Sequence, residues 1–153
     1  MKKNIEGVKI TPLKIISDDR GSVMHMMRND SKVFDKFGEI YFSTIFKGKI
    51  KAWHLHKEAT LNYACVYGEV KLVLFDERNG SSTFGEYQEI LLSLKNYNLI
   101  TIPPNIWNGF KGCNDQFSII ANCLNLPHNE KEMVRLDVKD LSLIHISEPT
   151  RQD

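Results

Sequence analysis

Two histidines, two residues apart, are the residues of this sequence best suited to chemistry. His54 and His56 lie in the run I-K-A-W-H-L-H, residues 50–56, whose composition favours a β-strand. Side chains alternate between the two faces of a strand, so both imidazoles are predicted to share one face with Ala52, while Trp53 takes the other. Histidine titrates within the physiological pH range, and the pair therefore predicts general acid/base chemistry.

A metal site is the main alternative for paired histidines, and the sequence disfavours it. Gly48 and Gly68 flank the pair at a spacing that resembles the first motif of the cupins, small β-barrels whose histidines point into the barrel mouth. In a metal-binding cupin, a glutamate would stand at Leu61 and a further histidine at Asn108. Leucine cannot ligate a metal and a neutral amide is a poor ligand for transition metals. We expect no metal and no cofactor.

Length and composition indicate one domain without a membrane segment. The chain has 153 residues and a formal net charge of +1, with no apolar run long enough to span a bilayer. The start, M-K-K-N-I-E-G, precedes no apolar segment, which predicts a cytoplasmic protein rather than a secreted one. The sequence lacks a basic cluster, so nucleic-acid binding is not expected. Cys65 and Cys123 lie in apolar runs and are predicted to be buried thiols.

Short strand-like runs separated by glycine, asparagine and proline fill most of the chain. Pro12 predicts an edge strand, residues 18–21 a turn, residues 30–38 a helical or looped excursion, and Pro103 with Pro104 a loop. Besides the histidine strand, strands are predicted at residues 8–16, 22–27, 41–46, 63–67, 70–76, 87–92, 98–102 and 117–124. This pattern predicts an all-β fold, a cupin-type jelly-roll barrel.

The last residues are interpreted as foreign to the domain. Residues 141–151, L-S-L-I-H-I-S-E-P-T-R, match the in-frame translation of a common DNA sequencing adapter. We therefore predict a single domain over residues 1–140, followed by a non-native tail at residues 141–153. On this interpretation His145 has no function.

Four blocks of sequence point to a particular family. They are D-D-R-G at 18–21, K-G-K-I-K-A-W-H at 47–54, D-E-R-N-G-S-S-T-F-G at 76–85 and I-P-P-N-I-W-N-G-F at 102–110. In this order they resemble the dTDP-4-dehydrorhamnose 3,5-epimerase family over roughly residues 8–137. The resemblance implies a cofactor-independent isomerase acting on a nucleotide-diphosphate sugar, in rhamnose or cell-surface polysaccharide biosynthesis. It also implies a homodimer that pairs or exchanges N-terminal strands.

The same resemblance assigns roles to individual residues. His54 falls on the base that takes a proton beside the 4-keto group, and His56 is a second catalytic candidate. Lys51 falls on the arginine that holds the substrate's charged oxygens, and Arg20 on the arginine expected at the diphosphate. Strict alternation places Lys51 on the strand face opposite His54, so a β-bulge is needed to bring both to one pocket.

Several family positions carry other residues here. The family lysine falls on Leu61, which leaves Asn62 as the nearest polar substrate-binding candidate. The second active-site histidine falls on Asn108, a candidate for substrate binding. The tyrosine that returns a proton falls on or near Ala121, and Tyr63 on the return strand is the candidate to replace it. The aspartate that orients the catalytic histidine is expected late in the sequence, beyond the domain's last natural residue.

Two other functions stay open from the sequence. H-L-H-K resembles the R-G-x-H-A-H-K stretch of the dTDP-sugar 3,4-ketoisomerases, in which paired histidines such as His54 and His56 move a proton between adjacent sugar carbons. A different class of function is a non-catalytic barrel that binds a sugar nucleotide, favoured by the replacements at Leu61, Asn108 and Ala121.

Overall fold

The structure is a computed structural model that describes residues 4–141. The predicted non-native tail, residues 141–153, lies outside the described residues except for Leu141. Within it, the regular structure is strand apart from two 3₁₀ turns, η1 (Glu130–Glu132) and η2 (Val138–Leu141). Neither turn, nor any other helix of the described chain, is long and apolar enough to cross a membrane.

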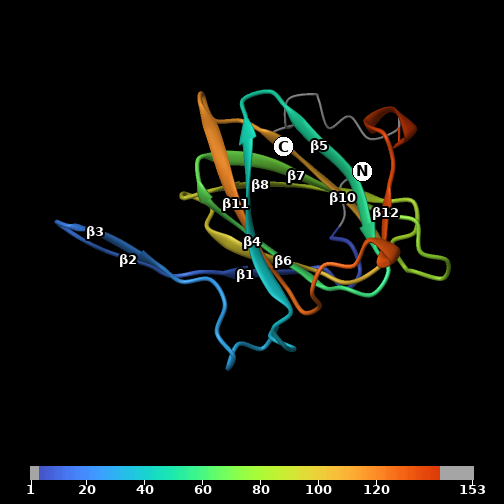
Figure 1. The fold of residues 1–153 in the computed structure, drawn as a ribbon, viewed down its shortest axis with the longest axis horizontal. Coiled ribbons are helices and arrows are strands. Elements are labelled where there is room, and N and C mark those ends of the chain that lie inside the picture. The colour runs from blue at the N-terminus through green and yellow to red at the C-terminus, as the bar shows by residue number, and fades with distance from the viewer. Residues whose placement is uncertain (1–3, 142–153) are drawn as a thin grey trace.

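Ten strands form two antiparallel sheets of five (Figure 1). The first sheet has the order β1 (Lys9–Pro12), β9 (Asn98–Ile102), β6 (Leu61–Tyr67), β11 (Phe117–Leu124), β4 (Glu39–Phe46). The second sheet has the order β12 (Met133–Arg135), β5 (Ile50–His56), β10 (Ile106–Gly112), β7 (Glu69–Asp76), β8 (Tyr87–Ser93). The remaining strands, β2 (Ile15–Asp18) and β3 (Gly21–Met24), form a hairpin that projects from the body.

The main hydrophobic core lies between the two sheets. Alternate residues of β7, among them Leu72 and Leu74, join inward-facing residues of the first sheet such as Leu61, Ile100 and Ile120 in one buried cluster. Burying this apolar surface from both sheets is the main driving force for closing the sandwich. The predicted fold class, an all-β jelly roll of the cupin type, is confirmed.

The sequence-based strand assignment was wrong in three places: the strands at residues 106–112 and 133–135 were missed, and residues 8–16 are not one strand. Residues 106–112 were not predicted as a strand, yet β10 is a central strand that pairs with both β5 and β7. Its asparagine and two glycines have low strand propensity, which two flanking strands override. The predicted strand 8–16 is divided between β1 and the β2–β3 hairpin, with Pro12 in an edge strand as expected. Residues 30–38 form turns and loop, which was one of the two predicted alternatives.

A β-bulge in β5 decides which side chains face the interior. His54 is opposite Asn108 and Lys51 is opposite Phe110, so two residues of β5 oppose the single residue Gly109. Both intervening residues, Ala52 and Trp53, pack on the outer face of the sheet. The expectation that Ala52 would share the histidine face was therefore wrong. The bulge brings Lys51 to the inner face, as a common pocket with His54 requires.

Gly109 makes this bulge possible. A Cβ atom at this position would lie 2.4 Å from the Cβ of Ala52. No side chain fits in that space without movement of the backbone, because real Cβ atoms do not approach so closely.

The outer face of the second sheet is covered by the C-terminal part of the described chain. Trp53 and Leu136 exchange two backbone hydrogen bonds, of 2.9 and 3.0 Å. The Trp53 indole N–H also donates to the carbonyl of Val138 at 3.3 Å. These contacts hold residues 133–138 along the edge of β5 and so place their neighbours at the mouth of the barrel.

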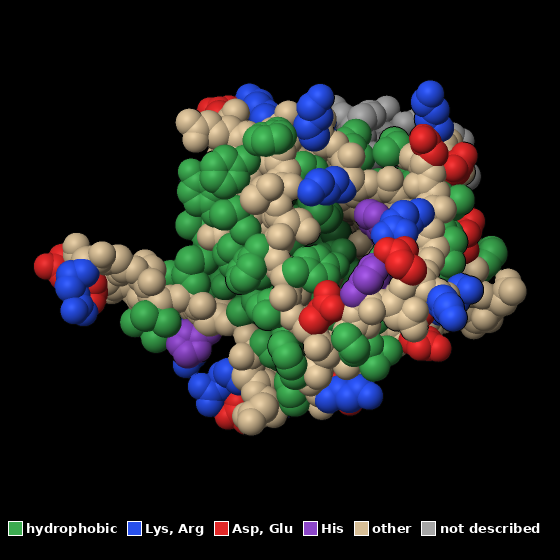
Figure 2. Space-filling model, in the orientation of Figure 1, with side chains coloured by type: hydrophobic (Ala, Val, Ile, Leu, Met, Phe, Trp, Pro, Cys, Tyr) green, Lys and Arg blue, Asp and Glu red, His purple; other side chains and the backbone are tan. Residues whose placement is uncertain are grey.

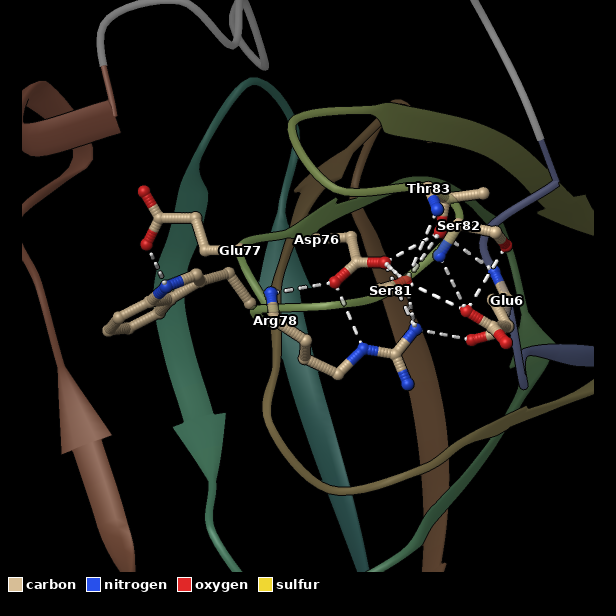
Figure 3. Close-up of polar contacts among 8 residues, drawn as sticks. Glu6, Asp76, Glu77, Arg78, Ser81, Ser82 and Thr83 are labelled. Atoms are coloured by element: carbon tan, nitrogen blue, oxygen red, sulfur yellow. Dashed lines mark hydrogen bonds and ion pairs between the residues drawn. The ribbon is translucent and has the colours of Figure 1, made fainter.

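A buried carboxylate organises the loop between β7 and β8 (Figure 3). The Asp76 side chain is fully buried and accepts hydrogen bonds from Arg78 at 2.9 Å, Ser81 at 2.6 Å and Thr83 at 2.6 Å. Burial alone would raise the pKa of Asp76, but these donors together hold it well below its usual value. Arg78 also donates to the Glu6 carbonyl at 2.6 Å, which ties the N-terminal segment to the loop. The loop is structural.

Candidate active site

A cavity of about 320 Å³ opens between the two sheets at the mouth of the barrel. In Figure 2 purple imidazoles lie beside a hollow whose rim carries basic and acidic side chains. Its lining comes from β4 and β6 on one side, from β5, β10 and β12 on the other, and from the loop after β11: Glu39, Tyr41, Ser43, Lys51, His54, His56, Tyr63, Phe110, His128, Met133 and Arg135.

His56 forms a buried pair with a carboxylate. Its Nδ1 lies 2.7 Å from Oε2 of Glu132, and the two residues are 8 % and 6 % exposed. The second oxygen of Glu132 accepts the backbone N–H of Ala59 at 2.9 Å, which fixes the carboxylate. An ionised carboxylate accepts only, so Nδ1 carries the proton and Nε2 is left as the basic nitrogen. This arrangement suits a general base whose imidazolium form is stabilised by the neighbouring charge.

His54 has a different environment. Arg135 is its direct neighbour across the β5–β12 pairing. Burial lowers the pKa of His54 below its usual value, and the nearby charges of Arg135, His56 and Lys51 lower it further. The imidazole is therefore held neutral near pH 7, when it can accept a proton or donate one hydrogen bond.

Lys51 reaches across the barrel mouth. Its Nζ donates to the backbone carbonyl of Thr44 on β4 at 2.7 Å, and the side chain lines the cavity beside His54. A lysine in this place supplies positive charge to a substrate oxygen, although without the two-pronged geometry of arginine.

Tyr63 and Asn108 form a support behind the cavity. The Tyr63 hydroxyl donates to Oδ1 of Asn108 at 2.9 Å, and the Asn108 amide donates to the backbone carbonyl of His54 at 3.1 Å. Asn108 is 1 % exposed and is absent from the cavity lining, so it positions β5 rather than contacting a ligand directly. Burial raises the pKa of Tyr63 well above its usual value.

Besides Asn108, two predicted substrate-binding residues lie outside the lining of this cavity. Asn62 is on the opposite face of β6 from Tyr63, because side chains alternate along the strand. Its amide bonds to the Cys123 carbonyl at 3.1 Å and to the Thr101 hydroxyl at 2.7 Å, a structural role. Arg20 is at the tip of the β2–β3 hairpin, 85 % exposed and paired with Asp18 at 2.7 Å. It does not line the cavity of its own chain.

Sequence reasoning missed several residues of the site, and three of them, Glu132, Arg135 and Tyr41, bear on its chemistry. Glu132 supplies the carboxylate expected beyond the domain's last natural residue, and it orients His56 rather than His54. Arg135 and Tyr41 also line the cavity. The available signal was the acidic residue just before the extended run M-V-R, since a short strand there would add to the edge of the histidine strand.

Over residues 4–141, no three or more histidine, cysteine, aspartate or glutamate side chains converge in a way that could hold a metal ion. The chemical groups at the cavity are imidazoles, carboxylates, phenols and cations.

A jelly roll with paired imidazoles and cations in its mouth defines a class, the cupin-fold sugar isomerases. The chain matches the family described as dTDP-4-dehydrorhamnose 3,5-epimerase over residues 2–149. It belongs to this family, as the sequence blocks indicated.

Individual relatives agree with this assignment. The chain is 31 % identical over 121 residues to a probable low-salt glycan biosynthesis epimerase, Agl13, from Haloferax volcanii, covering 78 % of each. It is 33 % identical over 107 residues to the spore coat polysaccharide biosynthesis protein SpsL from Bacillus subtilis, covering 70 % of this chain and 71 % of that protein. The crystal structure of a dTDP sugar isomerase from Desulfovibrio desulfuricans G20 superimposes with a TM-score of 0.88 at 37 % identity, covering 92 % of this chain and 90 % of the other.

Proposed function

We propose that this protein is a nucleotide-sugar epimerase that removes a proton from a carbon beside the 4-keto group of a dTDP-linked 4-keto-6-deoxy sugar. The observation that carries the proposal is the buried His56–Glu132 pair at 2.7 Å in a cavity also lined by His54 and Lys51. A base oriented by a carboxylate, next to cations, is what abstraction of a proton beside a carbonyl requires.

The contacts suggest a division of roles within the pair. His56 takes the proton, because Glu132 stabilises the imidazolium that forms. His54, held neutral, and Lys51 face the oxygen of the enolate that results, His54 as a hydrogen-bond donor and Lys51 as a charge. The sugar's own carbonyl accepts the electron pair, so the proposed reaction calls for no cofactor.

The diphosphate requires positive charge at the cavity rim. Arg135 lines the cavity and is paired with Glu130 at 2.8 Å, a contact that a diphosphate would replace. Arg20 cannot supply this charge to the cavity of its own chain, because it lies at the tip of the projecting hairpin.

A second copy of the chain would give the projecting hairpin a surface to pack against. Ile16 and Val23 are exposed on it, and Ile40 and Phe42 are exposed on β4, beside the cavity. Figure 2 shows a broad hydrophobic area on this face of the body, between the hairpin and the hollow. We therefore include in the proposal a homodimer in which the partner subunit's Arg20 reaches the diphosphate.

A second candidate reaction has its own support. His54 and His56 line the cavity from one strand, and two bases on one wall are suited to moving a proton between adjacent carbons of the same sugar face. That reaction would be a 3,4-ketoisomerisation of the same substrate class.

Proton NMR in heavy water with dTDP-4-keto-6-deoxyglucose distinguishes these functions. Deuterium entry at C3 or C5 with formation of an epimer supports the proposal, and a 3-keto product supports the ketoisomerase. Binding without exchange would leave a non-catalytic sugar-nucleotide-binding barrel.

Glu132→Gln tests the base in the same assay. The amide keeps the size of the side chain but removes the charge that stabilises the imidazolium, so the exchange rate is expected to fall about a hundred- to ten-thousand-fold. Glu58→Gln, an exposed carboxylate outside the cavity, serves as the matched control and should exchange at the wild-type rate. Wild-type exchange in the Glu132→Gln protein would contradict the assignment of the base.

A further inference from the structure

Three polar side chains lie in register across the first sheet. Asn122 on β11 is directly opposite Tyr41 on β4 and directly opposite Tyr63 on β6, so all three point to the same face. Both tyrosines line the cavity. His54 and His56 line it from β5, in the other sheet. The cavity therefore has a wall of imidazoles and a facing wall of phenols.

The two phenols differ in what they do with their protons. Tyr63 donates its proton to Oδ1 of Asn108 at 2.9 Å. Tyr41 instead accepts a hydrogen bond from Nδ2 of Asn122 at 3.0 Å. The orientation of the Asn122 amide is fixed, because its oxygen accepts the backbone N–H of Asn62 at 3.2 Å. The Tyr41 proton takes no part in the bond to Asn122 and is available to a ligand in the cavity.

The same amide stabilises Tyr41 after it has lost its proton. Burial raises the pKa of Tyr41, and the hydrogen bond from Asn122 acts in the opposite direction by favouring the phenolate. Nearby Glu39 and Glu132 oppose the phenolate by charge, which keeps the phenol protonated until a stronger base is present. The enolate carbon of the sugar is such a base.

Resting on the function proposed above, we infer that Tyr41 is the acid that returns a proton to the enolate carbon, from the wall opposite the histidines. On one face of the sugar ring the C–H bond breaks as His56 takes the proton and the electron pair passes into the enolate. On the other face a new C–H bond forms at the same carbon as the Tyr41 O–H bond breaks and leaves a phenolate. Water then reprotonates the phenolate and takes the proton from the His56 imidazolium. Removal and return on opposite faces invert the carbon, so the outcome is an epimer rather than a positional ketone.

This role falls on a different strand from the one that the family resemblance indicated. Ala121, at or near the family tyrosine, is opposite Phe42 and shares its outward-facing side of the first sheet. The next residue, Asn122, faces inward and holds Tyr41. The phenol is thus supplied by the neighbouring strand β4, and β11 supplies the amide that binds it.

Tyr41→Phe tests the inference, since it removes the hydroxyl and keeps the ring. With dTDP-4-keto-6-deoxyglucose in heavy water, this variant should still exchange the proton beside the keto group, returning deuterium from the histidine side with retention of configuration. Formation of the epimer should fall about a hundred- to ten-thousand-fold. Tyr67→Phe, an exposed tyrosine outside the cavity, is the matched control and should behave as wild type. Tyr63→Phe is measured alongside.

The outcomes separate the two proposals. Epimer formation at the wild-type rate in Tyr41→Phe, or the pattern of retained exchange and lost epimer in Tyr63→Phe instead, overturns the role of Tyr41 alone. If a Tyr41→Phe protein still binds dTDP by calorimetry but loses both exchange and epimerisation, the role is also overturned, because the hydroxyl would then be needed for proton removal. No exchange in the wild-type protein overturns the proposed function and the inference with it.

Discussion

At the scale of single residues, the two histidines are unequal although they share a strand face. His56 is buried against Glu132, whereas His54 faces Arg135 and Lys51. Burial and the nearby cations lower the pKa of His54, whereas the Glu132 carboxylate holds the His56 ring at Nδ1, so the two rings have different environments on one strand. Sequence alternation predicted the shared face, but only the folded chain shows which charges surround each ring.

Arg135→Gln is predicted to raise the pKa of His54. The charge of Arg135 is the second contribution, after burial, to the lowered pKa, so its removal should move the titration of His54 upward toward the ordinary value. The measurement is the pH dependence of the His54 ring proton shifts by NMR. Lys139→Gln, which removes an exposed lysine outside the cavity, is the control. An unchanged His54 titration in Arg135→Gln would show that the guanidinium does not act on this ring.

At the scale of elements, the bulge in β5 is the feature that assembles the site. Without it, Lys51 and His54 would lie on opposite faces, as strict alternation dictates. The sequence showed the need for a bulge but not its position. The bulge forms where β5 crosses Gly109, and β10, the strand carrying that glycine, was itself missed because its composition is poor for a strand.

Gly109→Ala is predicted to destabilise the fold and weaken substrate binding. The new methyl group would overlap the Ala52 side chain, and overpacking of this kind costs about 1–3 kcal/mol in the free energy of unfolding. Urea denaturation measures the loss, and a raised KM would report displacement of Lys51. In the double variant with Ala52→Gly the steric conflict disappears, so the two changes should cost less together than their sum. Strict additivity would argue against the contact.

The β7–β8 loop shows what sequence could predict well. The run from Asp76 to Gly85 was recognisable as a block shared with the family, and the fully buried Asp76 with its three donors shows why these polar residues occur together. The sequence could not show that this loop also binds the N-terminal segment through Arg78 and Glu6, because that contact joins residues far apart in the chain.

Asp76→Asn is predicted to lower the free energy of unfolding by about 3–5 kcal/mol, the usual cost of breaking a buried pair from one side. Because the pKa of Asp76 is depressed in the folded state, its contribution is present above the unfolded value near 3.8 and is lost as the pH falls below it. Denaturation at pH 7 and at lower pH measures both effects. The exposed Asp115→Asn, which breaks the surface pair with Lys47, is the control and should change stability little. Equal losses in the two variants would contradict the structural role.

At the scale of the whole molecule, the cavity is built from two sheets and, on the proposed dimer, from two subunits. Each sheet contributes one wall, so closure of the sandwich and assembly of the site are the same event. Fold class and family followed from the sequence. The position of Arg20 did not follow from the sequence. Arg20 lies at the tip of a hairpin that projects from the body, so within its own chain it is far from the cavity.

Subunit mixing tests the shared site. Arg20→Ala and His56→Asn proteins, each of low activity, should regain about a quarter of wild-type activity when unfolded and refolded together, since random pairing gives half mixed dimers with one complete site each. A mixture of His56→Asn and Glu132→Gln should regain none, because these two residues belong to the same chain's cavity. Failure of the first mixture, with mixed dimers confirmed by mass spectrometry, would place Arg20 outside the site.

The strip of chain from Glu132 to Val138 has a consequence for biosynthesis. It holds the carboxylate behind His56 and closes the open edge of β5, yet it leaves the ribosome after both sheets have otherwise been translated. A nascent chain can thus pair its other strands before the imidazole acquires its partner. The His56–Glu132 pair therefore forms only after the other strands of the two sheets have been translated.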